Sequence, residues 1–586
     1  MGAIQEADLA EARESFWRRR RWAKWVAGGL LVALAGLAFV VNLALRRTEP
    51  FLRARIVQAL SERFRARVEL DTLHVSLANG LQAEGKGLRI WPPDTQPGAD
   101  SSASADQAGE GEPMIRLAEF RFHAPLSYKP GKPIHISLME LKGLSVHVPP
   151  KSHFQRQQAV GSAPAGKPGG IAGLVSFVVD SVECTGAELV METSKPGKLP
   201  LTFEIAQLKV SNATSNGAMN FEAELTNPRP RGTIHTTGSL GPWPTAVAGN
   251  SSQGQRPVLG DPGETPISGD YRFDHADLST FKGIAGTLAS TGHYQGTLRA
   301  LMVDGDTQTP DFRLTHFGNA VNLTTHFHAK VDGTDGDTWL DPVDGTMERS
   351  HFTAQGQIVR VPVVAGGAQR GEGHDIALTV NVDKARIEDF LRLTSRSDAV
   401  LMTGDVAANA KLHVPPGPAP VYERLNLNGR FTLSKARFAS TKVQGRIAEL
   451  SLRGQGRPDE LKTTDPASIP AELQSGFQVA GGVVTLPAIE FTVPGADIQL
   501  RGTYGLDGGA LNFAGTAKMD ATVSQMVGGW KGLLLKPADR FLKKDGAGTE
   551  IPIHIEGTRE DPKFGIDFDR MKPSARKTEQ QKAEQQ

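Results

Sequence analysis

The chain has 586 residues, and 65 Lys and Arg against 64 Asp and Glu give a formal net charge of +1. Such a balance produces no long-range field that would concentrate nucleic acid. The single cysteine, Cys184, excludes a disulfide framework and any cysteine-based zinc or iron–sulfur site within this chain. Hydrophobic residues make up 39%, enough for a core, while 64 Gly and 37 Pro indicate many turns and short strands.

An uncharged stretch of 21 residues, from Trp25 to Leu45, is long enough to cross a hydrocarbon core as one helix. Basic residues are dense before it, at Arg18–Arg21 and Lys24, which predicts a cytoplasmic N-terminus at residues 1–24 and a single-pass anchor at 25–45. A cleaved signal peptide is the alternative, but the run is long and no small-x-small cleavage site follows it. The expected anchor residues are Trp25, Leu30, Leu31, Leu34, Leu37, Phe39 and Leu43.

The segment after the predicted anchor, residues 51–67, has the pattern of an amphipathic helix. Leu52, Ile56, Leu60 and Phe64 recur at steps of four residues. The other face is basic and suits contact with anionic lipid head groups. The alternative is a solvated face on an ordinary core helix. The residues predicted to contact head groups are Arg53, Arg55 and Arg63.

Low-complexity sequence divides the rest of the chain into blocks. Residues 46–155 form an N-terminal block with a hairpin signal at Asn79-Gly80 and a disordered insertion at 92–113. The main body covers residues 173–568. It is framed by a linker at 156–172, a flexible insertion at 241–266 and a disordered tail at 569–586.

Beyond residue 173 apolar and polar residues alternate in nearly every segment, as at Ile376, Leu378, Val380 and Val382. The pattern predicts roughly 25 strands of an antiparallel sheet with one apolar face. Three short helical patches, at 278–284, 387–393 and 523–530, indicate a weak internal repeat. They are too few to cover such a sheet. The expected fold is therefore mainly β, an elongated antiparallel sheet with a few short helices after the single transmembrane helix.

Candidates for chemistry are few. No nucleophile elbow and no zinc-protease motif occurs in the sequence. His326 and His328 share one face of a strand, but no third metal ligand lies near them in sequence. The acidic run Asp332–Asp337 lacks the ligand spacing of a calcium loop and is typical of a turn. We therefore expect no catalytic residue, no metal and no cofactor, and a protein that is not an enzyme.

Three segments carry a resemblance to a known family. Residues 53–91, which begin RARIVQAL and end GLRIW, resemble the opening of the bacterial AsmA-like family, where a helix after an anchor leads into a hairpin. Residues 114–151 are similar to the strands that follow in that family. The segment IPIHIEGTREDPKFGIDF, residues 551–568, resembles its closing segment. The order of these degenerate motifs carries the resemblance, and the long insertions depart from it.

The resemblance implies a repeating β-groove, a curved sheet with an apolar concave side, as in bridge-like lipid-transfer relatives such as TamB and YhdP. It implies a single-pass protein of the bacterial inner membrane whose bulk is periplasmic and conducts phospholipid towards the outer membrane. Roughly 25 strands about 4.8 Å apart would make a trough on the order of 120 Å. The candidate groove-lining residues are Val321, Leu323, Phe327, Leu378, Val380, Phe431, Leu511, Phe513, Ile553 and Ile555.

Other interpretations stay open at this point. A closed β-sandwich would bury the same ten residues. An envelope or outer-membrane protein assembly factor would need the same anchor but would act through an exposed strand edge. An exported hydrolase would need carboxylates that converge in a pocket. The expected partners are membrane lipids and envelope assembly proteins, and not nucleic acid.

Overall fold

The computed structural model describes residues 53–566, apart from a number of gaps. The gaps are residues 55, 59, 62–66, 77–80, 92–112, 125–133, 149–176, 193–199, 213–216, 243–244, 247–257, 260–261, 316–317, 362–372, 394–399, 507–508 and 528–547.

The described part of the chain is mainly β, which confirms the predicted fold class at this level. Its first strands are β1 (Val68–Glu69), β2 (Thr72–Ser76), β3 (Leu81–Ile90), β4 (Ile115–Ala124), β5 (Ile134–Ile136), β6 (Leu138–Val148), β7 (Phe177–Val179), β8 (Ser181–Met191), β9 (Leu201–Ser211), β10 (Met219–Asn227) and β11 (Arg231–Leu240). The middle strands are β12 (Thr245–Ala246), β13 (Val258–Leu259), β14 (Pro266–Asp277), β15 (Ile284–Ala285), β16 (Thr287–Thr297), β17 (Ala300–Leu314), β18 (Val321–Asp332), β19 (Asp337–Met347) and β20 (Ser350–Arg360). The last strands are β21 (His374–Arg386), β22 (Met402–Val414), β23 (Asn426–Phe438), β24 (Glu472–Ala480), β25 (Val483–Val493), β26 (Ala496–Gly505), β27 (Ala510–Met519), β28 (Thr549–Thr558) and β29 (Pro562–Ile566).

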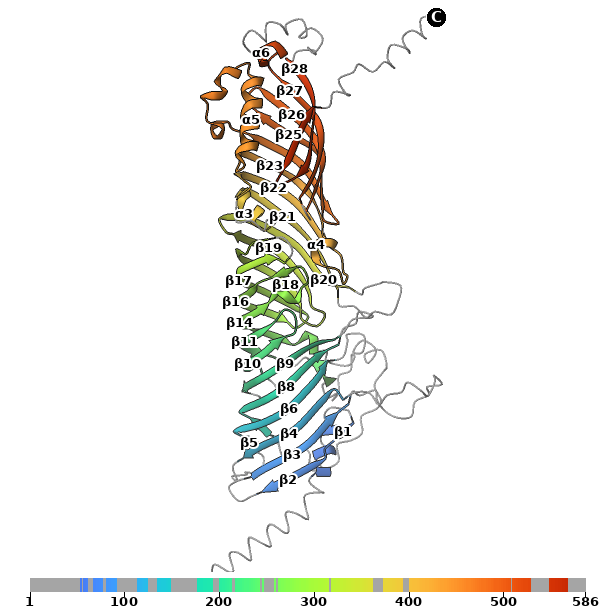
Figure 1. Cartoon of the computed structure of the whole chain (residues 1–586). Helices are drawn as coiled ribbons and strands as arrows, with labels where there is room; N and C mark the ends of the chain where they lie inside the picture. Colours follow the sequence, from blue (N-terminus) through green and yellow to red (C-terminus); the bar gives the residue numbers. More distant parts are fainter. Residues whose placement is uncertain are drawn as a thin grey trace, which may run out of the picture.

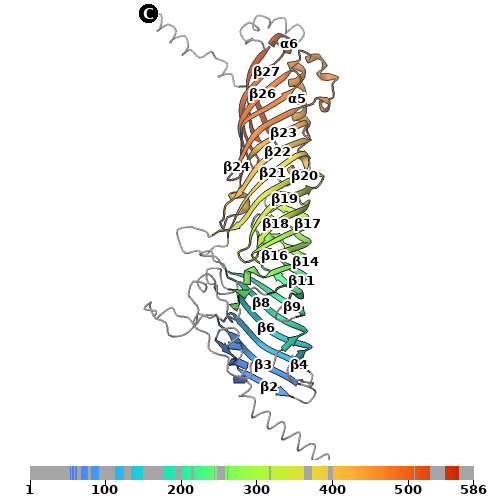
Figure 2. The same ribbon diagram turned by 180° about the vertical axis from the view of Figure 1, so that it is seen from behind.

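A single sheet contains 25 of these strands. Its members pair in chain order, and every pairing is antiparallel except that of β6 with β8, which is parallel. β5 with β7 and β12 with β13 form two small separate ladders. Figures 1 and 2 show the strands stacked from β2 at one end to β28 at the other. β1 and β2 both pair with β3, and β15 and β16 both pair with β17, so the 25 strands occupy fewer levels than their number. At about 4.8 Å between levels, the stack is roughly 100 Å long. Two packed sheets, as in a closed sandwich, are not formed by the described residues.

Repeated bulges curl this sheet. Gly87, Gly143 and Gly186 have φ angles of 68°, 63° and 65°, which favour glycine. They lie where the β3–β4, β4–β6 and β8–β9 ladders skip a residue, and the parallel register places Gly143 beside Gly186. In those three ladders one residue pair is skipped and the register is kept, whereas the register itself shifts in the β18–β19, β19–β20, β21–β22 and β25–β26 ladders. A bulge bends its strand and increases the twist, so the sheet curls into a half-barrel.

The helices of the described residues are short apart from one. They are η2 (Pro262–Glu264), η3 (Leu278–Thr280), α3 (Ile387–Arg392), α4 (Val421–Arg424), α5 (Thr441–Gly454), η4 (Pro458–Lys462), η5 (Pro466–Ser468) and α6 (Val523–Val527). The three predicted patches correspond to η3, α3 and α6. The expectation of only three was wrong, because α5 is longer than any of them. The Ser440 side chain caps α5 by accepting from the N–H of Val443, and Ile447, Ala448 and Leu452 are buried.

The curl brings the two long edges of the sheet together. We call the edge where strands lead into η3, α3, α5 and α6 the α3 edge, and the opposite edge, which carries α4, the α4 edge. After η3, the carbonyl of Lys282 accepts from Val421 N at 3.0 Å, at the start of α4. Near the C-terminal end, Lys442 Nζ at the start of α5 lies 3.3 Å from Asp561 Oδ1 in the β28–β29 turn. Each contact joins the α3 edge to the α4 edge several strands further along.

The structure describes only part of the N-terminal region for which predictions were made. Residues 53–54, 56–58 and 60–61 are helical, as the amphipathic pattern predicts. Val57 and Leu60 pack against Val68 and Ile90, and the Arg53 side chain is exposed. Arg55 and Arg63 lie outside the described residues, as do the predicted anchor at 25–45, the linker at 156–172 and the tail at 569–586. Within the described part of the chain, no helix has both the length and the hydropathy to cross a membrane.

Candidate functional site

One face of the sheet is apolar across the C-terminal strands. Residues that oppose each other directly in an antiparallel ladder point to the same side. Leu378 opposes Leu412, which in turn opposes Leu427. Leu427 opposes Val479, and Val479 opposes Val484. An unbroken row of aliphatic side chains therefore crosses five strands, β21 to β25, on one side.

The N-terminal strands carry a similar row. Ile90 opposes Ile115, which opposes Val146. Val146 lies beside Leu189 in the parallel ladder, and Leu189 opposes Phe203. Following the register from strand to strand places these residues on the same side as the row in β21–β25. We call this side the apolar face and the opposite side the polar face.

Burial places the apolar face on the inside of the curl. Ala223 and Ala329 are only 7% and 3% exposed, although the described residues contain no second sheet of comparable size. Side chains converge on the inside of a curved sheet and spread apart on the outside. Such small residues are therefore shielded by their own neighbours, and the apolar face lines a trough along the molecule.

The ten candidate groove-lining residues all lie on the apolar face. Phe327 opposes Val343, and Val380 opposes Ala410. Phe513 opposes Ile555, which opposes Phe564 on the last strand, β29. Val321 and Phe513 are buried, at 1% and 8% exposed. The other eight are half-buried, namely Leu323, Phe327, Leu378, Val380, Phe431, Leu511, Ile553 and Ile555.

Aromatic rings lie flat along this face over glycines of neighbouring strands. A Cβ atom at Gly85 would lie 2.2 Å from Phe120 Cζ, and one at Gly345 would lie 2.2 Å from Phe352 Cζ. Because the rings occupy the space above these glycines, they cover backbone instead of projecting into the trough. At these positions the face is lined with aromatic carbon.

A neutral hydroxyl band crosses the apolar face near the middle of the sheet. Its members pair with one another across strands. The Tyr271 hydroxyl lies 3.0 Å from Ser290 Oγ, the Tyr294 hydroxyl lies 2.7 Å from Thr236 Oγ1, and Thr307 Oγ1 lies 2.6 Å from Thr325 Oγ1. Burial raises the pKa of both tyrosines, so they stay protonated. The band adds polarity to the trough without adding charge.

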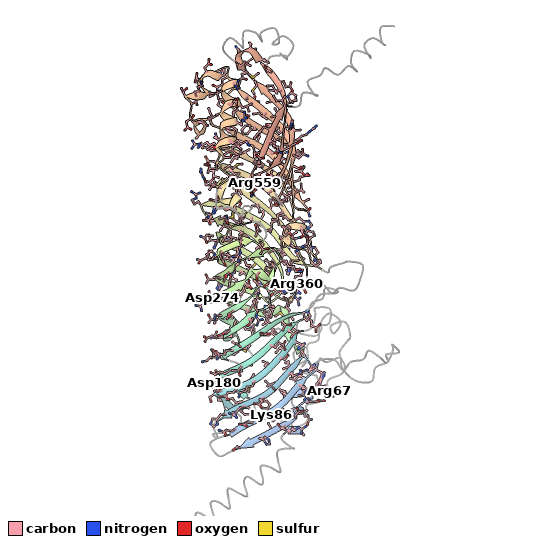
Figure 3. The ribbon with its side chains drawn as sticks, in the orientation of Figure 1. Arg67, Lys86, Asp180, Asp274, Arg360 and Arg559 are labelled. Atoms are coloured by element: carbon pink, nitrogen blue, oxygen red, sulfur yellow. The ribbon has the colours of Figure 1, made fainter. Side chains whose placement is uncertain are left out.

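The polar face carries ion pairs between neighbouring strands. Figure 3 labels charged side chains along the molecule, from Arg67 and Lys86 near one end to Arg559. Lys86 Nζ lies 2.8 Å from Glu119 Oε1, and this bond raises the pKa of Lys86 and lowers that of Glu119. A pocket of about 700 Å³ over β8–β11 and β14 is lined mainly by polar-face side chains such as Glu183 and Lys209. None of the ten candidate lining residues contributes to it.

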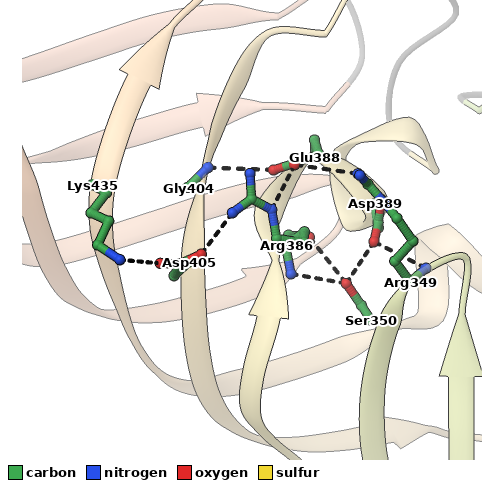
Figure 4. A network of polar contacts seen from close by, with 8 residues as sticks. All are labelled: Arg349, Ser350, Arg386, Glu388, Asp389, Gly404, Asp405 and Lys435. Atoms are coloured by element: carbon green, nitrogen blue, oxygen red, sulfur yellow. Dashed lines mark hydrogen bonds and ion pairs between the residues drawn. The ribbon is translucent and has the colours of Figure 1, made fainter. Parts of the chain in front are cut away.

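A buried charge cluster fixes α3 to the sheet (Figure 4). Glu388 and Asp389, in the first turn of α3, are 7% and 2% exposed. Glu388 Oε1 accepts from Arg386 Nε at 2.8 Å, and this bond raises the pKa of Arg386. Asp389 Oδ2 accepts from Ser350 Oγ at 2.8 Å, and Arg349 Nη2 lies 3.3 Å from its other oxygen. Both carboxylates are bonded to cations, which makes this cluster a structural tie.

We expect Asp389→Ala to lower the free energy of unfolding by about 2 kcal/mol, because it leaves buried polar partners such as Ser350 short of an acceptor. The matched control is Asp405→Ala, which removes an exposed carboxylate bonded to Arg386 and Lys435. It is expected to change the free energy of unfolding much less, because water screens an exposed ion pair. Urea unfolding followed by circular dichroism measures both. Equal losses in the two variants would contradict the role given to Asp389.

The structure treats the two sequence candidates for metal binding, the acidic run and the histidine pair, differently. Asp332 Oδ1 accepts from the backbone N–H groups of Thr334 and Asp335, which supports the turn interpretation of the acidic run. His326 and His328 do share one face of β18, and the structure brings Asp304 of β17 to them. That partner was missed because it lies 22 residues away from His326 in sequence. Asp304 and Asp306 have the same two-residue spacing as His326 and His328, and this shared spacing is the sequence signal that could have identified Asp304.

No protein-family model, no curated protein and no solved structure matches this chain.

Proposed function

We propose that this chain is an AsmA-like protein, anchored in the bacterial inner membrane by residues 25–45, that binds phospholipid acyl chains along its apolar face. In this proposal the lipid moves through the periplasm towards the outer membrane. The observation that carries the proposal is the apolar face on the inside of one curled sheet, with aliphatic rows in its N-terminal and C-terminal strands and a neutral hydroxyl band between them. Its aliphatic rows and flat aromatic rings offer acyl chains a surface that no second sheet of the described residues covers.

Simple energetics support a role without covalent chemistry. Burying a methylene group contributes about 0.8 kcal/mol, so half-burying a 16-carbon acyl chain contributes on the order of 6 kcal/mol. That is enough to hold a lipid out of water. A chain that leaves a bilayer for the trough exchanges one apolar environment for another, so its transfer is close to balanced in free energy. Partition along the apolar face, whose hydroxyl band carries no charge, then moves lipid without an energy source at each step.

The test is native mass spectrometry with lipid extraction on residues 48–586, purified without detergent. The expected result is several phospholipid molecules bound per chain, because a trough of roughly 100 Å has room for more than one. A lipid-free, monodisperse protein would contradict the proposal.

A second candidate function rests on the free edge of β29. This last strand pairs only with β28 among the described residues, and its Phe564 and Ile566 side chains are 46% and 43% exposed. Such an edge suits the addition of a strand from another protein, as an envelope assembly factor would require. Lipid-free protein that binds outer-membrane protein strands, and loses this binding in Phe564→Lys, would favour this function over lipid transport.

A further inference from the structure

Two strands of the polar face bring two histidines and an aspartate together. His326 and His328 lie two residues apart on β18, and Asp304 of β17 directly opposes His328. Side-chain ligand atoms of the three residues all lie within 4.8 Å of one another. No second group of three such residues with this spacing occurs in the described part of the chain.

The geometry is close to that of a metal site. Zn²⁺ binds nitrogen and oxygen at about 2.0–2.2 Å, so tetrahedral ligand atoms lie about 3.3 Å apart. Small side-chain rotations are enough to close the present separation, because His326, His328 and Asp304 are 43%, 48% and 53% exposed. The two imidazole rings lie 5.0 Å apart between centroids and are nearly perpendicular.

The surroundings favour a bound cation. Asp306 opposes His326, and its Oδ1 lies 2.9 Å from His326 Nδ1. A carboxylate on one ring nitrogen is the usual support of a metal-binding histidine, because it fixes the tautomer and leaves Nε2 for the metal. Asp344 opposes His326 from the other side, on β19. Three carboxylates therefore surround the two imidazoles.

We propose that Asp304, His326 and His328 bind a divalent transition-metal ion on the outside of the trough, with Zn²⁺ as the best match. Two imidazoles with one carboxylate suit Zn²⁺, whereas Mg²⁺ and Ca²⁺ take oxygen ligands. The ion clamps β17 to β18 and keeps a fourth position for water or for a group from a partner. This site does not depend on the proposed lipid function, because it lies on the opposite face of the sheet.

The test is a competition titration of Zn²⁺ between a chromophoric chelator and the purified full-length chain. We expect one saturable Zn²⁺ per chain. His328→Gln and His326→Gln should abolish it, and Asp306→Asn should weaken it about 10- to 100-fold. His413→Gln is the matched control, since it breaks a similar cross-strand pair with Asp375, at 2.8 Å, outside the group. The control should bind Zn²⁺ as the unaltered chain does.

Circular dichroism confirms that each variant keeps its β structure, and the visible absorption of Co²⁺ bound to the unaltered chain reports the coordination geometry. Saturable Zn²⁺ binding that persists in both histidine variants would overturn the proposal, as would the absence of saturable binding. Equal affinity for Mg²⁺ would also overturn it, since that would show a response to the carboxylates alone.

Discussion

Bound phospholipid is expected to fall at least about tenfold when Val380 is replaced by aspartate, a change equivalent to about 1.4 kcal/mol in binding. Val380 is half-buried on the apolar face, between Ala354 and Ala410 on the neighbouring strands. An acyl chain that crosses this position would desolvate the new carboxylate, and among the described residues the neighbours of Val380 on this face, Ala354 and Ala410, carry no charge. The measurement is lipid extraction with native mass spectrometry on residues 48–586.

The control for this prediction is the adjacent residue on the same strand. Thr379 lies on the polar face, between Gln355 and Lys411, so Thr379→Asp adds the same charge to the outside of the trough. It should leave the bound lipid unchanged. Phe513→Asp should also abolish loading, but Phe513 is 8% exposed and covers Gly502, so its stability must be measured in parallel. Lipid retained at the level of the unaltered chain in Val380→Asp would contradict the groove.

The alternation of apolar residues was sufficient to predict the sheet and the shared face of the ten lining candidates. A period of two is a local property, and it survives bulges because each bulge only resets the phase. The curl was not predictable in the same way. It depends on where register shifts accumulate, and Gly143 and Gly186 become meaningful only when the parallel ladder places them side by side.

Three features were not predicted from the sequence, and each depends on contacts between residues that lie far apart along the chain. Asp304 meets His328 only through the register of β17 and β18. Asp389 meets Ser350 across the α3 edge. Helix α5 was overlooked because Gly445 weakens its helical pattern, whereas its stability comes from packing of Ile447 and Val443 against the core cluster of the sheet. The two side-chain contacts and helix α5 therefore all depend on tertiary structure.

The contacts between the two sheet edges lead to a second prediction, which concerns the rate of lipid release. Lys442 and Asp561 are 64% and 67% exposed, and such a pair contributes at most about 1 kcal/mol. The trough near its C-terminal end is therefore held shut only weakly at this contact. Lipid that leaves the trough here would need the α3 edge to separate from the β28–β29 turn.

Joining these edges covalently should slow lipid release. In Lys442→Cys/Asp561→Cys, a short cleavable bis-maleimide is expected to slow transfer to acceptor vesicles at least about tenfold, which corresponds to about 1.4 kcal/mol in the barrier. Cys184 is 2% exposed, so the two new thiols react selectively. Cleaving the linker should restore the rate.

The matched control is Lys435→Cys/Asp405→Cys, which replaces an ion pair of 3.2 Å between the adjacent strands β22 and β23. The same linker there joins neighbours and leaves the two edges free to part, so it should not change the rate. If both cross-linked proteins release lipid equally fast, the lipid does not leave between the edges at this contact. Release would then have to occur at the end of the sheet, beyond β29, where Phe564 and Ile566 continue the apolar face into solvent.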